Sequence, residues 1–313
     1  MKKIFIDGKD GTTGLKIYER FEGRSDIELL LIDEDKRKDP KERASLINES
    51  DITFLCLPDA ASIEAVSLVE NDRVKIIDTS TAHRTLCDWA YGFAELSESH
   101  RKRIESSNRI AVPGCYASGF NSIVYPLIAS GFIDKEYDIT CFALSGYTGA
   151  GKKGIAQYED ENRSTELDAP RLYALTQQHK HLKEMKAISG LSREPIFSPV
   201  ICDYPRGMVV EIPLYTHRMN KKYTVKDIYE MFAAHYEGTD IVKVREPGYT
   251  QTMISANAFD GRDDMEIEIN GNDERILVTS RFDNLGKGAS GAAVQCMNIA
   301  LGIDEKTGLN IGE

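Results

Sequence analysis

The sequence predicts an α/β protein of two domains, a doubly wound parallel sheet followed by an α+β domain with a mixed or antiparallel sheet. Up to about residue 131, short β-branched strands alternate with helical segments, which is the pattern of a parallel sheet. Beyond that point, apolar and polar residues alternate, as at 265–269, which is typical of a sheet with one wet face. The length of 313 residues suits two domains better than one core.

The first domain is expected to be Rossmann-like, because each strand is followed by a loop and then by a helix. A helix with Leu15, Tyr18 and Phe21 on one face should follow the first strand, and another with Ile63, Val66 and Val69 should follow the third. The predicted strands are 2–7, 27–33, 52–57, 74–77 and 110–112.

A glycine-rich loop lies between the first strand and its helix. It holds Gly8, Gly11, Thr12, Thr13 and Gly14, with the glycines spaced G-x-x-G-x-x-G rather than in the usual G-x-G-x-x-G. A loop at this place can present backbone N–H groups to a pyrophosphate. A plain tight turn is the alternative interpretation, and the position at the opening of a βα unit favours the nucleotide site.

The charges after the second strand bear on which dinucleotide would bind. Asp33 lies 19 residues after Gly14, where an acidic residue often binds the ribose 2′-OH of NAD. Lys36, Arg37 and Lys38 follow directly and could instead meet the 2′-phosphate of NADP. A solvated loop would explain the same charge cluster.

Cys115 is the candidate nucleophile. The apolar strand 110–112 runs into Pro113 and Gly114, and a buried helix through 120–128 follows. Cys115 therefore lies at a helix N-terminus, where unpaired N–H groups and the positive end of the dipole favour the thiolate, the nucleophilic form of cysteine. A small buried core cysteine is the alternative. Because ligands of doubly wound sheets bind beyond the carboxyl ends of the strands, Pro58 and the segment 80–84 should lie near the same crevice.

The second domain should run from 115 to 285, and the first from 1 to 114, completed by the C-terminal segment 286–313. Small residues recur at helical spacing through 289–301, so this last helix should pack closely on the first domain, with Gly302 as its cap. A helix is predicted at 224–236. The predicted strands are 138–145, 195–201, 208–216, 265–269 and 275–281.

Composition excludes several classes of function. Thirty-nine Lys and Arg against 50 Asp and Glu give a net charge of −11, which argues against a nucleic-acid or anionic-membrane binder. No apolar run suits a bilayer span or a signal peptide, so a cytoplasmic protein is expected. The six cysteines form no CxxC pair, match no zinc template and should be free thiols; no metal site is expected.

Several blocks of sequence, taken together and in order, resemble the N-acetyl-gamma-glutamyl-phosphate reductases, in their shorter bacterial form, of the semialdehyde dehydrogenase superfamily. They span the chain nearly end to end. The blocks are 8–14, 78–84, 91–96, 113–117, 145–152 and 283–289. The chain departs from the family pattern in four places: Ser118 replaces a usual threonine, a small residue or threonine is usual near Ile123, His179-Lys180-His181 lacks the family's following proline, and the segment around Arg206 is altered.

The resemblance implies NADPH-dependent reduction of N-acetylglutamyl 5-phosphate, an acyl phosphate, to the 5-semialdehyde with release of phosphate, a step of arginine biosynthesis. It implies a thioester on Cys115 and a general acid–base at His181, with His179 as second candidate. It also implies a homo-oligomer, a dimer or a tetramer. The expected cofactor residues are Gly8, Gly11, Thr12, Thr13, Gly14, Pro58, Ser80, Gly146 and Asn284, with Asp33 as a weak addition. The expected substrate residues are Arg84, Arg206, Ser118 and Lys152.

Three other interpretations compete with this one. An enzyme like aspartate-semialdehyde dehydrogenase would use the same chemistry on another acyl phosphate. A dinucleotide-binding sensor without catalysis would have no need of a nucleophile at Cys115, and a cysteine hydrolase would have no need of the loop 8–14. The alternative to a catalytic role for His179 and His181 is that both are solvated residues on a polar helix from Gln177 to Lys186.

Overall fold

The fold is described from a computed structural model, which describes residues 1–248 and 252–312. The chain divides into two compact units. Unit 1 comprises Met1–Gly114 and Ala289–Leu309, and unit 2 comprises Cys115–Gly288 with the residues from Asn310 onward. Each unit has its own sheet, so each is described by itself.

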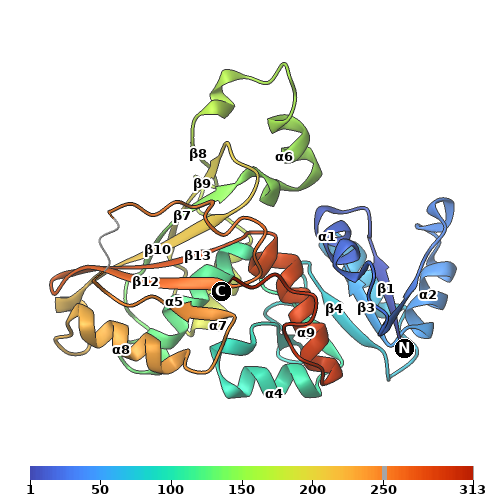
Figure 1. The fold of residues 1–313 in the computed structure, drawn as a ribbon, viewed down its shortest axis with the longest axis horizontal. Helices are drawn as coiled ribbons and strands as arrows, with labels where there is room; N and C mark the ends of the chain where they lie inside the picture. Colours follow the sequence, from blue (N-terminus) through green and yellow to red (C-terminus); the bar gives the residue numbers. More distant parts are fainter. Residues whose placement is uncertain (249–251, 313) are drawn as a thin grey trace. The chain divides into compact units, whose positions relative to one another are not determined.

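Unit 1 is built on a six-stranded parallel sheet in the order β2-β1-β3-β4-β6-β5 (Figure 1). The strand order reverses between β1 and β3, so their carboxyl ends form the switch point at which doubly wound sheets bind ligands. The strands are β1 (Lys2–Asp7), β2 (Ile27–Leu30), β3 (Ile52–Leu55), β4 (Lys75–Asp78), β5 (Ala90–Tyr91) and β6 (Arg109–Ala111).

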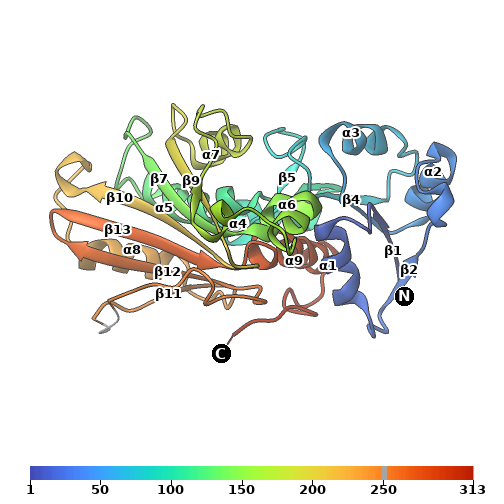
Figure 2. The same cartoon turned by 90° about the horizontal axis from the view of Figure 1, so that it is seen from above.

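Helices cover both faces of this sheet, as Figure 2 shows. Ile4 and Ile6 of β1 share a core with helices α1 and α9, whereas Phe5, between them in sequence, shares the opposite core with α2 and α3. This alternation follows from the two-residue period of a strand. The helices of unit 1 are α1 (Thr12–Phe21), α2 (Pro40–Glu49), α3 (Asp59–Ser67), α4 (Glu98–Ser106) and α9 (Gly291–Leu301).

Unit 2 holds a seven-stranded mixed sheet in the order β11-β12-β13-β10-β7-β9-β8. The long strands β12, β13, β10 and β7 are antiparallel neighbours, whereas β7 pairs with β9 and β11 with β12 in parallel. The strands are β7 (Thr140–Gly146), β8 (Arg171–Leu172), β9 (Ile196–Cys202), β10 (Met208–Tyr215), β11 (Val242–Val244), β12 (Met265–Asn272) and β13 (Arg275–Phe282).

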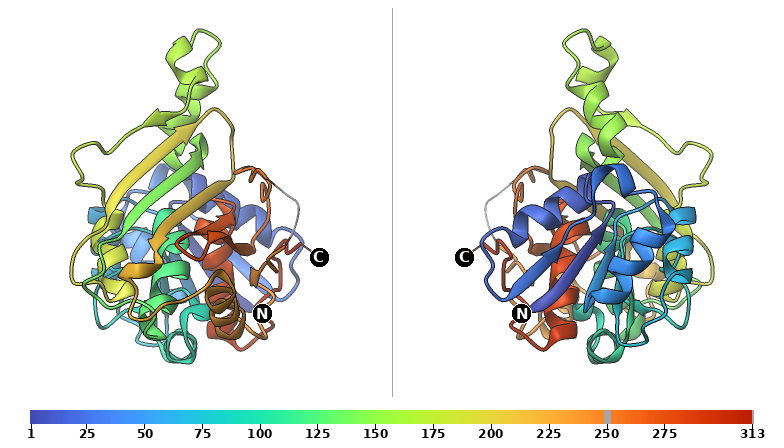
Figure 3. Two further views of the ribbon diagram at one scale, coloured as in Figure 1. Left: turned by 90° about the vertical axis from the view of Figure 1, so that its left-hand side faces the viewer. Right: turned by 90° about the vertical axis from the view of Figure 1, so that its right-hand side faces the viewer.

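Helix α5 (Cys115–Ala129) packs directly on this sheet, because Gly119 lies against Val210 of β10 and Phe282 of β13. A Cβ at residue 119 would come within 2.5 Å of Val210 Cγ2, so the helix approaches as closely as it does only with a glycine here. Helices α7 (His181–Ser189) and α8 (Val225–His235) lie on the same side (Figure 1). Helix α6 (Gly151–Tyr158) extends from the end of the sheet (Figure 3).

The predicted α/β class and the mixed second sheet are confirmed, and the differences are local. Strand β2 ends at Leu30 rather than at residue 33, and helix α7 begins at His181 rather than at Gln177. The predicted apolar faces are wrong at two exposed residues, Leu15 and Ile63, whereas Ile17 and Ala65 are buried in their helices. In α3 the buried residues are the small Ser62 and Ala65, whereas α1 buries Gly14, Ile17 and Phe21. Elements α2, α4, α6, β5, β8 and β11 were not predicted, and α6 begins in a segment expected to be a loop.

The last helix, α9, contributes to the core of unit 1. Its alanines, Met297 and Ile299 are buried against β1, α1 and β6, and Gly302 ends it with a left-handed φ of 69°. The small side chains allow close contact: a Cβ at Gly92 would lie 2.9 Å from Cys296 Sγ. In the part of the chain that the structure describes, no helix combines the length and apolar character needed to cross a membrane.

Candidate functional site

Cys115 is the first residue of α5 in unit 2, and it is a partly exposed free thiol. The Pro113–Gly114 turn ahead of it is buried. The N–H groups of the first helical turn and the positive end of the dipole therefore lie at the sulfur. The chain approaches it closely at Gly288, where an added Cβ would lie 2.9 Å from Cys115 Cβ.

Rings from four elements gather beside Cys115. Tyr116 follows it on α5, and its ring centroid lies 6.4 Å from Tyr173, 5.8 Å from His179, 5.9 Å from His181 and 5.1 Å from Phe197. The two histidine rings are 4.8 Å apart and edge-on. The structure thus brings both predicted histidines to the neighbourhood of the predicted nucleophile, and neither lies on a solvated helix.

The two histidines differ in environment. His181, at the start of α7, is buried. His179 precedes the helix, and its Nδ1 accepts a hydrogen bond of 3.2 Å from the backbone N–H of His181. That bond requires an unprotonated Nδ1, so the ring proton of neutral His179 is on Nε2. Burial, aided by the charge of Lys180, lowers the pKa of His179 to about 4, so it is neutral near pH 7.

Tyr116 and Tyr173 were not proposed as site residues from the sequence. Burial raises the pKa of both phenols above their ordinary value, and the sulfur of Cys115 raises both further. Both hydroxyls therefore keep their protons and can donate hydrogen bonds near Cys115. The sequence shows a tyrosine directly after the cysteine. No sequence pattern indicates that Tyr173 lies near Cys115.

Ser118 lies one helical turn after Cys115. It is 1% exposed, and its Oγ is a buried atom without a hydrogen-bond partner among the described residues. Because residues three apart share a helix face, this hydroxyl is on the side of α5 that carries Cys115. Buried hydroxyls are normally bonded, so an orphan here is consistent with a ligand contact.

The other residues predicted in unit 2 lie on helix α6, at the end of β7 and in the loop after β9. Lys152 is exposed on α6, and Arg206 pairs with Asp260 at 2.8 Å. Gly146 packs on the backbone of Pro205, where a Cβ would come within 2.5 Å of Pro205 O.

Asn284 is 1% exposed, and it joins two loops of unit 2. Its side-chain N–H donates to Thr148 Oγ1 at 3.0 Å, and its oxygen accepts from Gly207 N at 2.9 Å. A contact of Asn284 with a nicotinamide would use its second amide hydrogen or the second lone pair of its oxygen, and it stays a prediction.

The predicted dinucleotide loop lies in unit 1 between β1 and α1. Gly8 has φ 88°, and Gly11 N donates to Gly8 O at 2.9 Å, so the loop closes as a tight turn directly before the helix. A Cβ at Gly14 would come within 2.4 Å of Gly8 O, which makes the third glycine a packing requirement. The N-terminus of α1, with Thr12 and Thr13 as its first residues, is left facing outward from the sheet's carboxyl edge.

Neighbouring loops of unit 1 hold the other predicted cofactor residues. Pro58 caps α3 after β3, at the switch point. Asp33 is exposed and lies 3.6 Å from Lys36, whereas Arg37 pairs with Asp10 of the glycine loop at 2.6 Å. A basic side chain is therefore in contact with the loop predicted to bind the pyrophosphate.

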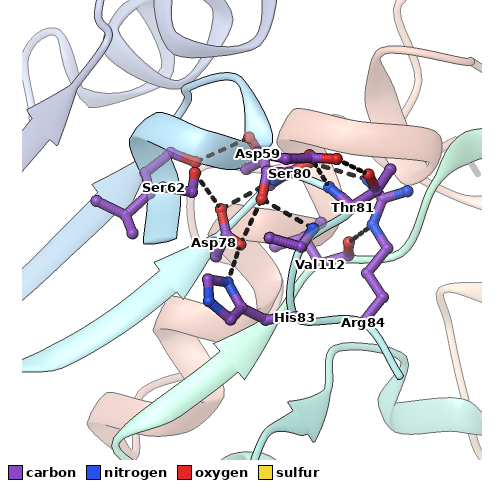
Figure 4. Close-up of polar contacts among 11 residues, drawn as sticks. Asp59, Ser62, Asp78, Ser80, Thr81, His83, Arg84 and Val112 are labelled. Carbon is purple, nitrogen blue, oxygen red and sulfur yellow. Dashed lines mark hydrogen bonds and ion pairs between the residues drawn. The ribbon is translucent and has the colours of Figure 1, made fainter. Parts of the chain in front are cut away.

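A buried polar network follows β4, and sequence reasoning missed its centre, Asp78 (Figure 4). Its carboxylate accepts from Ser62 Oγ at 3.0 Å and from Ser80 Oγ at 2.6 Å, and lies 2.6 Å from His83 Nδ1. The ring of His83 stacks on Trp89 with centroids 4.0 Å apart. The hydroxyl of Ser80 and its backbone N–H, which donates to Asp78 Oδ1 at 2.9 Å, are both used within the protein, so a contact with cofactor would come from its carbonyl.

Arg84, predicted to bind substrate, is buried at the end of the same network. Its Nε donates to Val112 O and its Nη2 donates to Thr79 O, both at 2.9 Å. Two of its donors therefore connect the carboxyl ends of β4 and β6, the strand that leads to the Pro113–Gly114 turn. Substrate contact by Arg84 remains a prediction.

Comparison with known proteins agrees with this geometry. The model of a family described as "Semialdehyde dehydrogenase, dimerisation domain" matches residues 115–284. The chain is 44% identical over 318 residues to N-acetyl-gamma-glutamyl-phosphate reductase 2 of Nostoc sp., covering 98% of this chain and 99% of the relative. It is 46% identical over 303 residues to the N-acetyl-gamma-glutamyl-phosphate reductase of Sinorhizobium fredii, covering 96% and 98%.

Solved structures agree with the fold. Aspartate semialdehyde dehydrogenase II of Vibrio cholerae superposes with a TM-score of 0.72 at 15% identity, covering 96% of this chain and 98% of that one. The aspartate semialdehyde dehydrogenase of Francisella tularensis gives 0.72 at 14% identity, covering 96% and 99%. At such identities the likeness concerns the fold alone.

Proposed function

The chain belongs to the N-acetyl-gamma-glutamyl-phosphate reductase family, and from that premise we propose how its own residues carry out the reaction. It is an oxidoreductase that converts N-acetylglutamyl 5-phosphate and a reduced nicotinamide dinucleotide to N-acetylglutamate 5-semialdehyde and phosphate, in arginine biosynthesis. The observation that carries the mechanism is a partly exposed cysteine at the first position of a buried helix, flanked by two histidines and two tyrosines.

Cys115 is the nucleophile in this proposal. Its thiolate attacks the acyl carbon, and the bond between that carbon and the phosphate oxygen breaks. Inorganic phosphate departs, and the acyl group is then bound to the sulfur as a thioester. NADPH, when bound, supplies the hydride that reduces this thioester. The resulting thiohemiacetal collapses to free aldehyde and restores the thiolate. The helix N-terminus stabilises the sulfur anion at the start and at the end of the cycle.

Proton transfer is assigned to His181, with His179 in support. A neutral His179 has its proton on Nε2 and acts as a hydrogen-bond donor, so the buried His181 remains as the group that exchanges protons. The phenol of Tyr116 is hydrogen-bonded to that of Tyr173, so Tyr173 and the unpartnered Ser118 hydroxyl are the donors available for the oxygen that becomes negative. Arg206, Arg84 and Lys152 remain candidates for the anionic groups of the substrate.

We assign NADP to unit 1. The turn 8–14, with no side chain at its glycines, and the helix N-terminus behind it fit a pyrophosphate. Lys36, Arg37 and Lys38 offer three cations beyond β2, which suits a 2′-phosphate better than the single Asp33 suits a ribose hydroxyl. Unit 2 matches a dimerisation domain, so we propose a homo-oligomer, a dimer or a tetramer, formed through this unit.

The test runs the reaction backwards. The purified protein is incubated with N-acetylglutamate semialdehyde, phosphate and NADP, and absorbance of the reduced nucleotide is followed at 340 nm as the usual readout. NAD and aspartate semialdehyde serve as the comparison arms. We expect turnover with the N-acetylated substrate and NADP, and at least roughly a hundredfold lower kcat/KM with aspartate semialdehyde.

C115S is the matched variant, because it retains a nucleophile of the same shape but of much lower acidity. It should lose at least about three orders of magnitude in kcat while still binding nucleotide. Equal turnover of both aldehydes, or an active C115S protein, would refute the proposal.

A further inference from the structure

The turn at 174–177 connects strand β8 to the histidines and has an unusual backbone. Of the non-glycine residues that the structure describes, Ala174 and Gln177 are the two with positive φ, at 53° and 56°. Gln177 N donates to Ala174 O at 2.9 Å and closes the turn. Left-handed residues other than glycine and asparagine are disfavoured, and they persist where surrounding structure imposes them, often at functional sites.

The side chain of Gln177 is what attaches this turn to the sheet. Its Nε2 donates to Phe197 O at 2.7 Å, and its Oε1 accepts from Phe197 N at 2.9 Å. Tyr173 N donates to Pro199 O, two residues further along β9, at 3.2 Å. In the antiparallel register of β8 and β9, Leu175 would face Phe197 if β8 continued. The carboxamide therefore supplies the pair of hydrogen bonds that the backbone of Leu175 would then have made. Asparagine suits this backbone better but is one methylene shorter, so glutamine is the residue that reaches.

Phe197 couples this attachment to the site. Its backbone is held by Gln177, and its buried ring lies 5.2 Å from the ring of His179 and 5.1 Å from that of Tyr116. Tyr173 and His179, on either side of the turn, have ring centroids 5.7 Å apart. The groups beside Cys115 are thus placed by a short strained turn that is attached at Tyr173 and at Gln177.

We propose that Gln177 is a positioning residue for the reduction: by pairing its carboxamide with the backbone of Phe197, it holds Tyr173 and His179 in place over Tyr116 beside Cys115. The kinetic part of its test rests on the proposed function, and a second readout does not. Gln177 touches none of the reacting atoms, so its effect is expected in kcat rather than in binding.

Q177N and Q177G separate this role from a structural one. Both relieve the left-handed backbone, so a residue needed only to form the turn would be replaced without loss. If Gln177 is a positioning residue, kcat of both variants should fall by roughly tenfold or more. Their KM for substrate and nucleotide should stay within about threefold of the wild-type values, and the thermal midpoint of unfolding should not change. Q177E keeps the acceptor for Phe197 N but not the donor, and should fall between. Q178N, at the exposed neighbour, is the control.

The second readout is the titration of His179 by NMR in protein with labelled histidines. Only six histidines are present, and H179Q identifies the resonance by its loss. In the wild type, His179 should stay neutral almost to pH 4, whereas in Q177N its midpoint should move towards the ordinary 6.5 as the turn opens to water. The titratable neighbours of His179 are identical in the wild type and in Q177N. They are Tyr116, Tyr173, Lys180 and His181.

The outcomes are distinguishable. Wild-type kcat together with an unchanged His179 titration in Q177N and Q177G would overturn the proposal, as would losses that Q178N shares. If the wild type turns over none of the aldehydes, the proposed function fails, and the NMR titration alone then decides on Gln177: a raised midpoint supports it, and an unmoved one refutes it.

Discussion

At the scale of single residues, the site depends on groups kept in one protonation state. The phenols of Tyr116 and Tyr173 stay protonated because burial and the nearby sulfur both oppose a second negative charge. His179 stays neutral because burial and Lys180 oppose a positive one. The cluster beside Cys115 therefore consists of neutral donors, which suits the stabilisation of an oxygen anion.

The neutrality of His179 predicts an acid-sensitive fold. Its ordinary pKa of 6.5 falls to about 4 in the folded protein, so between these values the unfolded chain binds the additional proton. The stabilisation is complete above pH 6.5 and is lost as the pH falls towards 4. The urea midpoint of the wild type should thus fall more steeply between pH 6.5 and 4.5 than that of H179Q.

H217Q controls this measurement, because His217 is an exposed histidine of the same unit. It should retain the wild-type dependence on pH. Parallel curves for wild type and H179Q would mean that His179 is protonated in the folded protein.

At the scale of elements, function depends on loops whose backbones approach each other closely. In unit 1 the glycine loop closes directly before α1, and in unit 2 Gly288, within the π-helical turn Gly286–Ser290, lies against Cys115. Neither approach leaves room for a Cβ. These contacts are between backbone and small side chains. Such atoms cannot move aside for a new methyl group as the end of a flexible side chain could.

G14A tests the first of these loops. The new methyl group would lie 2.4 Å from Gly8 O and 3.0 Å from Lys9 Cα, so the loop must open and its N–H groups must turn away from a pyrophosphate. We expect KM for NADPH to rise by roughly tenfold or more. Alkylation of Cys115 by iodoacetamide, a property of unit 2, should keep its wild-type rate.

G23A is the control for a general loss of stability. Gly23 also has a positive φ, of 78°, but nothing lies within 4 Å of an added Cβ. It should therefore strain the backbone and leave nucleotide binding intact. A similar rise in KM for both variants would indicate instability rather than loss of the loop.

At the scale of the whole molecule, unit 1 is made from both ends of the chain. Helix α9 comes last in sequence, yet its side chains fill one of the two cores against β1 and α1. The first 114 residues therefore lack part of their own core. The core of unit 1 is therefore complete only when the C-terminal helix is packed in it.

M297A measures this dependence. Met297 is fully buried in the core of unit 1, so its truncation should cost about 2–5 kcal/mol of unfolding free energy. M253A, at a methionine 78% exposed, should change it by no more than about 0.5 kcal/mol. Urea unfolding followed by nucleotide fluorescence reports on unit 1. Equal stability of the two variants would contradict a structural role for α9.

The elements with a strong local pattern were predictable. The parallel strands of unit 1, the alternating strands β12 and β13 and the capped helix α8 were all read from the order of apolar and polar residues. Cys115 was found in the same way, because a strand, a Pro–Gly turn and an amphipathic helix are consecutive in the chain. The helix α7 was placed too early, because nothing local marks the left-handed residues Ala174 and Gln177.

The fold class and the family were thus settled by the order of the residues, since each depends on interactions between near neighbours in the chain or on motifs in sequence. The same order predicts Cys115 as the nucleophile, and that role stays a prediction. The surroundings of Cys115 could not be predicted from the sequence. That Tyr173 and His179 meet Tyr116, that Asp78 binds Ser62, Ser80 and His83, and that the amide of Gln177 pairs with Phe197 are contacts between distant segments. Only the packing of sheets and helices decides them, because the free energy of such contacts depends on burial, which local sequence does not specify.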